Sequence, residues 1–187
     1  MQPVTIHCRS PTFPTPSEPM FTSLQDFIAL WDAESASTRK VMAELTDASL
    51  AQRVTGDHRT LGRMAWHLAQ SIPEMTGKLG LAVKGPGEHD AVPTSAAAIV
   101  AAYDLAAGSV AAAIYTAKWT DAELATTRAM YGETWTVAFA LRVVLFHEVH
   151  HRGQMTVLMR QAGLTVPGVY GPAQQDWATY GMQPPAI

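Results

Sequence analysis

Long stretches with helical spacing of apolar residues constrain this fold more than any other feature of the sequence. In the segment after Ser23, apolar residues return every three or four positions, at Phe27, Leu30, Trp31, Val41 and Leu45. The alternation of apolar and polar residues that marks a half-buried strand is almost absent from the chain. We therefore expect an all-α protein in which each helix buries one face against its neighbours.

Local signals divide the chain into four long helices. Side chains that cap helix starts are present at Thr22 or Ser23 and at Thr94 or Ser95, and the other two long helices are expected to start near Thr60 and near Thr136. Pro73 is expected to kink or split the second helix, because its ring clashes with the carbonyl four residues earlier. The last helix is expected to end at Gln161, because Gly163 is a natural stop. Four such helices predict a four-helix bundle.

The remaining segments fit around one domain. Residues 1–20 are rich in proline and predict an extended N-terminal arm. Residues 21–187 predict a single bundle domain with a loop-like C-terminal tail, whose aromatic residues are expected to pack back on the body. The stretch MYGETWTV before the last helix, with Gly132 at its turn, predicts a small hairpin or a simple connecting loop.

Composition excludes several classes of function. The chain is 48% hydrophobic with a net charge of -3, which suits a soluble globular protein and leaves no basic surplus for nucleic acid. A single cysteine, Cys8, excludes an internal disulfide framework and indicates a reducing cytoplasm. No run of 18 or more apolar residues is present, so no membrane partner is expected.

The segment HEVHHRG, residues 147–153, carries the main chemical signal. His147, Glu148 and His151 match the H-E-x-x-H pattern of zinc peptidases. Four residues advance a helix by about 400°, so the two histidines lie one turn apart on one face. That face also carries apolar residues, and two buried imidazoles so close together favour a bound metal. The alternative is a pair of buried histidines satisfied by hydrogen bonds.

A zinc peptidase is the least favoured of the functional hypotheses. Such enzymes take a third ligand downstream of the motif, but no Glu or His follows His151 and the only later acid is Asp176. Glu148 would be the general base of a peptidase. Otherwise it is expected to orient a histidine or to meet solvent.

His67, in the middle of the second helix, is a better source of the third ligand. Two histidines from one helix and one from another can meet in a bundle core. Three protein nitrogens leave an open position for water or substrate, as in catalytic rather than structural metal sites.

The two histidine segments together resemble the DinB/YfiT superfamily of metal-dependent proteins. The stretches that carry the resemblance are RTLGRMAWHLAQS and LFHEVHHRGQMTVLMRQAG, and the match covers about residues 21–172. The resemblance implies a bundle in up-down-down-up order, often a homodimer, with nickel or zinc held by His67, His147 and His151. It also implies transfer or isomerisation reactions that depend on a low-molecular-weight thiol.

Four neighbouring residues complete the predicted site. Glu34 is expected to hydrogen-bond a ligand imidazole or to lie at the rim, and Glu74 to be an acid–base group at the site mouth or a surface residue. Gln154 is expected to point inward and tie its helix to a neighbour. Arg152 is expected to point away, in a surface or subunit pair.

These features together predict a metal-dependent S-transferase or hydrolase that acts on a small molecule in the cytoplasm. Lewis-acid activation of water or a thiol at the open metal position is the expected mechanism. The alternative is a non-enzymatic bundle in which the metal is structural or sensed.

Overall fold

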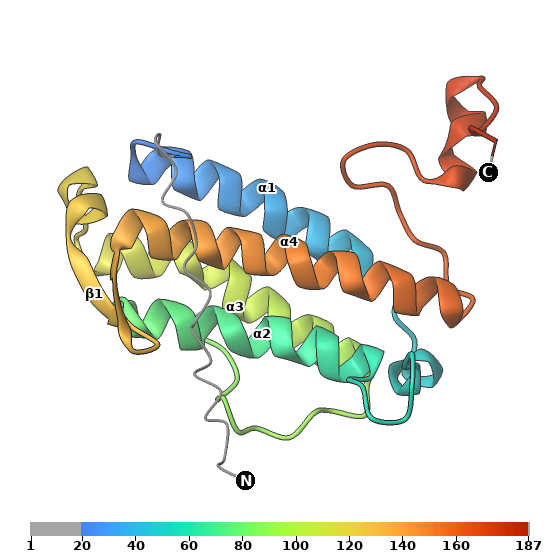
Figure 1. Cartoon of the computed structure of the whole chain (residues 1–187), viewed down its shortest axis with the longest axis horizontal. Helices are drawn as coiled ribbons and strands as arrows, with labels where there is room; N and C mark the ends of the chain where they lie inside the picture. The colour runs from blue at the N-terminus through green and yellow to red at the C-terminus, as the bar shows by residue number, and fades with distance from the viewer. Residues whose placement is uncertain (1–19, 187) are drawn as a thin grey trace, which may run out of the picture.

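The computed structural model describes residues 20–186, so the predicted arm lies almost wholly outside the described residues. Within this range the body consists of four long helices: α1 (Leu24–Met42), α2 (Leu61–Lys78), α3 (Ala96–Thr116) and α4 (Val137–Gln161). Three short 3-10 helices and one hairpin complete the described elements: η1 (Asp47–Ala51), η2 (Asp121–Ala125), η3 (Gln174–Tyr180), β1 (Thr127–Met130) and β2 (Glu133–Thr136). Figure 1 shows that α1 and α4 run one way and α2 and α3 the other. The predicted all-α bundle in up-down-down-up order is confirmed.

The helix starts follow the predicted caps. Ser23, Thr60, Ser95 and Thr136 each accept a hydrogen bond from the backbone N–H three residues later. At the end of α4, Gly163 adopts a left-handed φ of 74° and its N–H donates to the carbonyl of Arg160. Glycine takes this conformation without strain, which explains why the helix stops there.

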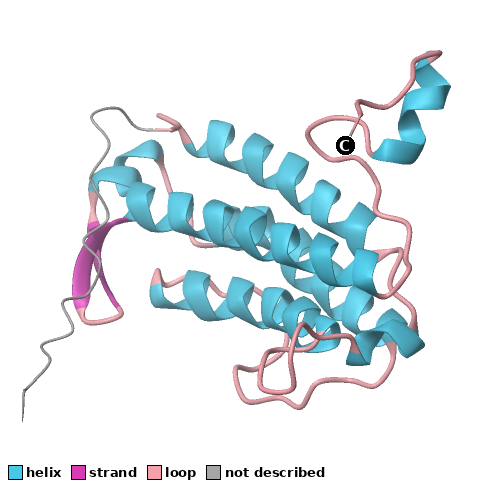
Figure 2. Cartoon of the chain, turned by 45° about the vertical axis from the view of Figure 1, so that its right-hand side comes forward, coloured by secondary structure: helices cyan, strands magenta, loops and turns pink. Residues whose placement is uncertain are grey.

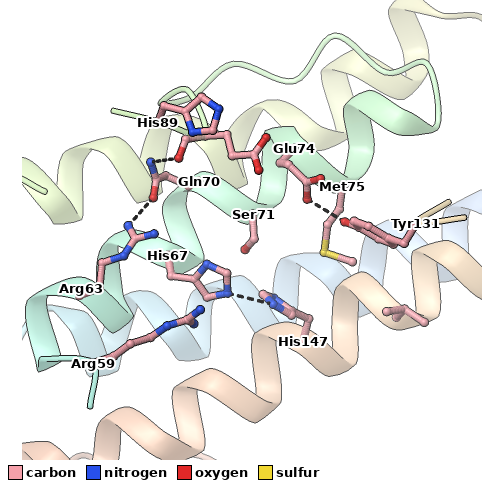
Figure 3. A pocket seen from close by; sticks show the side chains of 12 residues that line it. Arg59, Arg63, His67, Gln70, Ser71, Glu74, Met75, His89, Tyr131 and His147 are labelled. Carbon is pink, nitrogen blue, oxygen red and sulfur yellow. Dashed lines mark hydrogen bonds between the residues drawn. The ribbon is translucent and has the colours of Figure 1, made fainter. Parts of the chain in front are cut away.

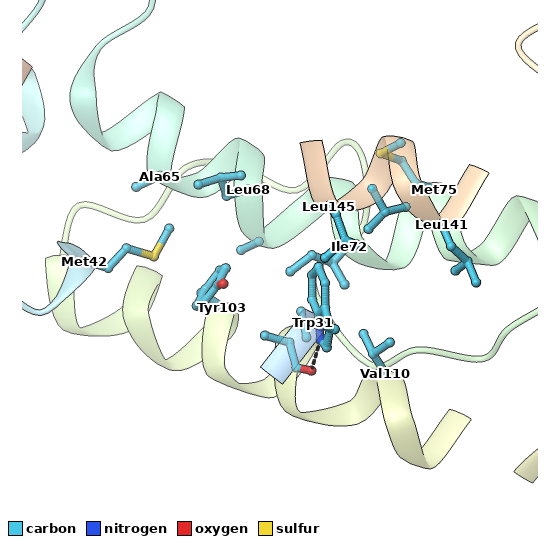
Figure 4. Close-up of a cluster of buried hydrophobic side chains, with 14 of the residues drawn as sticks. Trp31, Met42, Ala65, Leu68, Ile72, Met75, Tyr103, Val110, Leu141 and Leu145 are labelled. Atoms are coloured by element: carbon cyan, nitrogen blue, oxygen red, sulfur yellow. Dashed lines mark hydrogen bonds between the residues drawn. The ribbon is translucent and has the colours of Figure 1, made fainter. Parts of the chain in front are cut away.

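Large side chains from α1 and α3 fill the centre of the bundle. Trp31 and Tyr103 are 1% and 0% exposed, and they lie among aliphatic residues from all four helices (Figure 4). The indole N–H of Trp31 donates to the carbonyl of Ala107 on α3 over 3.0 Å. Small residues on α3, such as Ala106, allow this close approach.

Pro73 does not split α2. The helix continues through it from Leu61 to Lys78, so of the two predicted outcomes, a kink or a split, the split does not occur. The ring instead lies against the crossover loop that joins α2 to the parallel helix α3. A Cβ added at Gly85 of this loop would lie 3.0 Å from Pro73 Cγ and 3.1 Å from Ala106 Cβ. The absence of a side chain at Gly85 therefore lets the crossover pass close to both helices.

A hairpin rather than a simple loop precedes α4. β1 and β2 pair in antiparallel register, with Met130 opposite Glu133. The two turn residues, Tyr131 and Gly132, both have positive φ, 51° and 86°, as a tight two-residue hairpin turn requires. The turn places Tyr131 beside α2, where its hydroxyl donates to Glu74 over 2.7 Å.

α3 differs from the other helices in composition. By length and hydropathy it is the one helix of the described range that could cross a membrane, and 39% of its most apolar window is buried. In the structure its buried residues pack against α1 and α2 as part of the bundle core.

The C-terminal tail only partly follows its prediction. Val166 is buried against the bundle, but η3 contains no buried residue and stands apart from the four helices (Figures 1 and 2). Tyr180 is 67% exposed, so this aromatic does not pack back on the body as expected.

Candidate metal centre

Three imidazoles meet between α2 and α4. The Nε2 atom of His147 lies 3.2 Å from Nε2 of His67 and 3.1 Å from Nε2 of His151. The three form a group whose ligand atoms all lie within 4.8 Å of one another. The helical spacing of His147 and His151 puts both on the face of α4 that contacts α2.

The surroundings of these imidazoles favour their neutral form. Burial lowers the pKa of His67 to about 4 and that of His147 to about 3, and nearby positive groups add to the effect. Burial likewise lowers the pKa of His151. Nδ1 of His151 lies 2.7 Å from the Oε1 atom of Gln154, so this nitrogen carries the proton and leaves the Nε2 lone pair free.

This geometry suits a divalent metal. Three nitrogens bound to one zinc ion at tetrahedral angles lie roughly 3.3 Å apart, given Zn–N bonds of about 2.0–2.1 Å. Within residues 20–186, other imidazoles are the only hydrogen-bond partners of the three Nε2 atoms. A shared cation would satisfy three lone pairs that these contacts cannot satisfy together. His67, His147 and His151 could therefore hold a metal ion.

His67 and His147 form part of the wall of a polar pocket of about 570 Å³ (Figure 3). The other residues that line this polar pocket come from α2, from the loops that flank it, from β1–β2 and from α4: Arg59, Arg63, Gln70, Ser71, Glu74, Met75, Glu88, His89, Tyr131 and Val143. The histidine group is therefore open on one side to a cavity large enough for a small molecule.

A second pocket, of about 560 Å³, is lined in part by His151. Its walls contain more apolar side chains, among them Met64, Val157 and Leu158. Arg59 lines both pockets. The three histidines thus take part in the walls of two cavities, one polar and one more apolar.

Glu148 faces away from both pockets. Its side chain is 1% exposed, and Oε1 accepts a hydrogen bond of 2.5 Å from the hydroxyl of Tyr103. Burial raises the pKa of the carboxyl to about 7, against the opposing effect of the Tyr103 hydroxyl and the Arg152 charge. The expectation that Glu148 meets solvent is wrong, because α1 and α3 cover this face of α4.

Arg152 is also buried, at 3% exposed, and the prediction of a surface or subunit pair is wrong. Its guanidinium donates to the carboxylate of Glu34 over 2.6 Å and to the hydroxyl of Thr38 over 3.2 Å. The hydroxyl of Tyr170 lies 2.7 Å from the same guanidinium. Glu34 therefore contacts Arg152 and Tyr170 instead of a histidine, and it joins α1 to α4 and to the tail.

Gln154 and Glu74, the other residues of the predicted site, lie on the same side of the bundle as the histidine group. Gln154 is exposed and contacts His151 of its own helix, not a neighbouring helix. Glu74 lines the polar pocket, where it accepts from Tyr131 and pairs with Lys78 over 3.2 Å. His150 is exposed on the outside of α4.

Arg59, Arg63 and Tyr131 are among the pocket residues that were not recognised from the sequence. Arg63 lies four residues before His67 on α2, so helical spacing alone could have placed it on the same face. Tyr131 reaches the pocket only because the hairpin turn folds back on α2, which no local pattern reveals.

Comparisons with known proteins agree with this fold. The DinB family model matches residues 20–185. The chain is 43% identical to the uncharacterised protein YrdA of Bacillus subtilis over 168 residues, which cover 90% of this chain and all of that protein. A crystal structure of a DinB-like protein from Bacillus cereus is 42% identical, with a TM-score of 0.76, and covers 81% of this chain and 100% of its own.

A more distant structure supports the fold alone. The DinB-like protein YjoA of Bacillus subtilis is 15% identical, with a TM-score of 0.59, and covers 77% of this chain and 97% of its own. The bundle order and the three-histidine group describe a helical protein suited to metal binding. The chain belongs to the DinB family.

Proposed function

We propose that this protein is a metal-dependent enzyme that transfers a low-molecular-weight thiol to a small electrophile. Hydrolysis of a small molecule is the second choice. The convergence of the Nε2 atoms of His67, His147 and His151 beside an open pocket carries the proposal. Nickel or zinc is the proposed ion, because imidazole nitrogen is a good ligand for both.

The metal would supply the nucleophile. A divalent ion held by three imidazoles lowers the pKa of a coordinated water or thiol, so that a nucleophile is present at neutral pH. The pocket walls offer no competing protein nucleophile, since the hydroxyl of Ser71 donates to the carbonyl of Leu68. Glu74, at hydrogen-bond distance from Tyr131, is the proposed acid–base group of the polar pocket.

The accessible surroundings favour catalysis over a structural metal. Structural zinc sites are closed by four protein ligands, whereas three ligands beside a cavity leave one position for substrate. Peptide hydrolysis is disfavoured because the H-E-x-x-H mechanism needs the glutamate beside the metal-bound substrate. The Glu148 carboxylate instead lies on the face of α4 that contacts Tyr103.

We also propose a cytoplasmic homodimer with no nucleic-acid partner. Large apolar side chains exposed on α3, Leu105 at 51% and Tyr115 at 64%, are consistent with contact to a second copy. Light scattering at micromolar concentrations is expected to give twice the 20.2 kDa chain mass. A mass equal to one chain across that range would contradict the dimer.

Elemental analysis tests the metal directly. Protein purified without chelator or affinity-tag nickel is expected to contain about one divalent ion per chain. His67→Ala is expected to lose it, and full occupancy in that variant would refute the three-histidine site.

A turnover assay then tests the reaction. Metal-loaded protein, His151→Ala and metal-free protein are incubated with a bacterial thiol and a chromogenic electrophile. Loss of the rate in both controls is expected, and equal rates in all three samples would remove the catalytic proposal. A parallel peptide assay tests the peptidase alternative. Peptide cleavage that is abolished by Glu148→Gln would favour the peptidase over the proposed enzyme.

A further inference from the structure

The end of the C-terminal tail is hydrogen-bonded into a defined shape but is not packed on the bundle. At the start of η3, the carboxylate of Asp176 accepts from the backbone N–H of Ala173 over 2.9 Å. Gln175 donates to the carbonyl of Val166 over 2.9 Å. Even so, η3 has no buried residue and stands apart from the four helices (Figures 1 and 2). A few surface hydrogen bonds do not offset the entropy lost in ordering a segment, so such an element needs a surface to pack on.

The first part of the tail is fixed to α1 and α4, and this sets the direction of η3. The hydroxyl of Tyr170 donates to the carboxylate of Glu34 over 2.6 Å and accepts from the guanidinium of Arg152 over 2.7 Å. Lys40 of α1 donates to the carbonyl of Gly168 over 3.1 Å. These contacts hold the tail on the α1 side of α4, from where η3 extends away from its own bundle (Figure 1).

The side chains that the end of the tail presents are apolar and aromatic. Tyr180 and Met182 are 67% and 54% exposed, and Trp177 is half-buried. Asp176 is the one charged side chain in residues 171–186, and its carboxylate is already used within the tail. Aromatic residues and methionine are enriched in protein interfaces, and charged residues are depleted there. The composition of this segment is therefore typical of a contact surface.

The second pocket offers an apolar surface at the same end of the molecule. Its walls include Val157 and Leu158 near the end of α4, Met64 of α2 and Val54 of the loop after η1. Val54 and Val157 are 61% and 54% exposed, so the described part of the chain leaves much of this wall uncovered. The tail leaves the bundle from the same end, directly after Gln161 (Figure 1).

A second copy of the chain fits both observations. An uncovered apolar segment and an uncovered apolar pocket at one end of a chain can cover each other twice when two copies pair about a two-fold axis. Burying roughly 100 Å² of each of Trp177, Tyr180 and Met182, with an equal area of pocket wall, gives about 600 Å² per contact for side chains of this size. Two such contacts reach about 1,200 Å², the lower limit for stable and specific interfaces.

We propose that η3 of one copy docks in the second pocket of a partner copy, while η3 of the partner docks in return. The aromatic side chains of the tail then cover the cavity that His151 lines in the other subunit, and the polar pocket remains the route to the histidines. This inference names the contact surface of the proposed homodimer and rests on that proposal. It requires neither a bound metal nor turnover.

Disulfide crosslinking tests where the tail docks. In a Cys8→Ser background, the full chain carries Tyr180→Cys together with Val157→Cys, and mild oxidation is followed on a non-reducing denaturing gel. We expect a covalent species of twice the 20.2 kDa chain mass, which reductant removes. Each single cysteine variant, and Tyr180→Cys with Val92→Cys, are controls that should keep the single-chain mass. Val92 is 36% exposed and lies outside both pockets.

Dissociation constants test the pocket wall without any crosslink. Val157→Lys places a charge in the second pocket and is expected to weaken the dimer about tenfold to a hundredfold, as for the loss of an interface hot spot. Val92→Lys is the matched control and is expected to stay within about twofold of wild type, as for a position outside the interface. Light scattering over a dilution series gives the constants, and circular dichroism shows that each variant is folded.

A second cysteine pair, Met182→Cys with Val54→Cys, covers another orientation of the tail. A crosslink within a single chain would overturn the inference, because η3 would then fold back on its own pocket. So would the absence of a crosslink in both pairs, or equal dissociation constants for wild type and Val157→Lys. If the mass in solution is nevertheless that of two chains, the homodimer stands and only the place of the tail is wrong. A single-chain mass would refute both.

Discussion

Two faces of α4, offset by a single residue, carry polar groups in opposite situations. His147 and His151 face α2, and among the described residues their Nε2 atoms contact only other imidazoles. Glu148 and Arg152 face α1 and α3, where they are 1% and 3% exposed and bonded to protein side chains. One face is left open to a ligand, while the other is closed.

The difference shows how one short motif can serve two purposes. A carboxyl or guanidinium group without water must find partners within the protein, and Tyr103, Thr38 and Glu34 provide them. The histidine face avoids such partners, which keeps its lone pairs available. We infer that the Glu148–Arg152 face holds α4 in place, so that the histidine face keeps its geometry. Substitutions on each face should therefore affect different measurements.

Replacing Arg152 should have the largest effect on stability. Arg152→Met removes the charged partner of the Glu34 carboxylate, which keeps only the Tyr170 hydroxyl as a donor, and it removes the donor to the Thr38 hydroxyl. Breaking a buried ion pair costs about 3–5 kcal/mol. Because the side chain of Glu34 is 18% exposed, we expect the lower part of this range. Urea unfolding measures the change, with Arg160→Met in the same helix as the exposed control. A loss no larger than that of the control would show that the ion pair does not hold α4.

Removing the hydroxyl of Tyr103 should have a smaller effect. Tyr103→Phe keeps the ring in the core but deletes the donor to Glu148, which should cost about 1–3 kcal/mol in unfolding free energy. The metal content per folded chain is expected to stay unchanged, because Tyr103 lies outside the histidine group. Tyr115→Phe, at an exposed position on the same helix, is the control. Loss of metal with unchanged stability would reverse the assignment of the two faces.

Gln154 tests the histidine face and should show the smallest effect. Gln154→Ala removes the acceptor at Nδ1 of His151, so the ring loses its fixed tautomer and orientation. Groups of this kind contribute about tenfold to a hundredfold to metal affinity, and we expect about tenfold because Gln154 is exposed. Competition with a chelator of known affinity measures it. Arg160→Ala, at an exposed position near the end of the same helix, should leave the affinity unchanged.

Much of the fold could be predicted because its signals are local. Apolar residues at helical spacing indicated the four helices, and the caps at Ser23 and Ser95 fixed two of their starts. The spacing of His147 and His151 put them on one face whatever the helix packs against. Family resemblance and mid-helix position together pointed to His67 as the third member. At Pro73 the sequence left a kink and a split open, and the split does not occur because the helix accommodates the ring next to a glycine in the crossover.

What the sequence determined by itself is thus the set of helices and the pair of histidines on one side of α4, since both depend on rotation per residue within one helix. Only the tertiary structure decided what covers the other side. Adjacent residues differ by about 100° in direction, and whether that direction meets solvent or another helix depends on where α1 and α3 pack. For this reason Arg152 is buried despite its charge, and Arg59 and Tyr131, from segments far apart in the chain, line one pocket with the histidines.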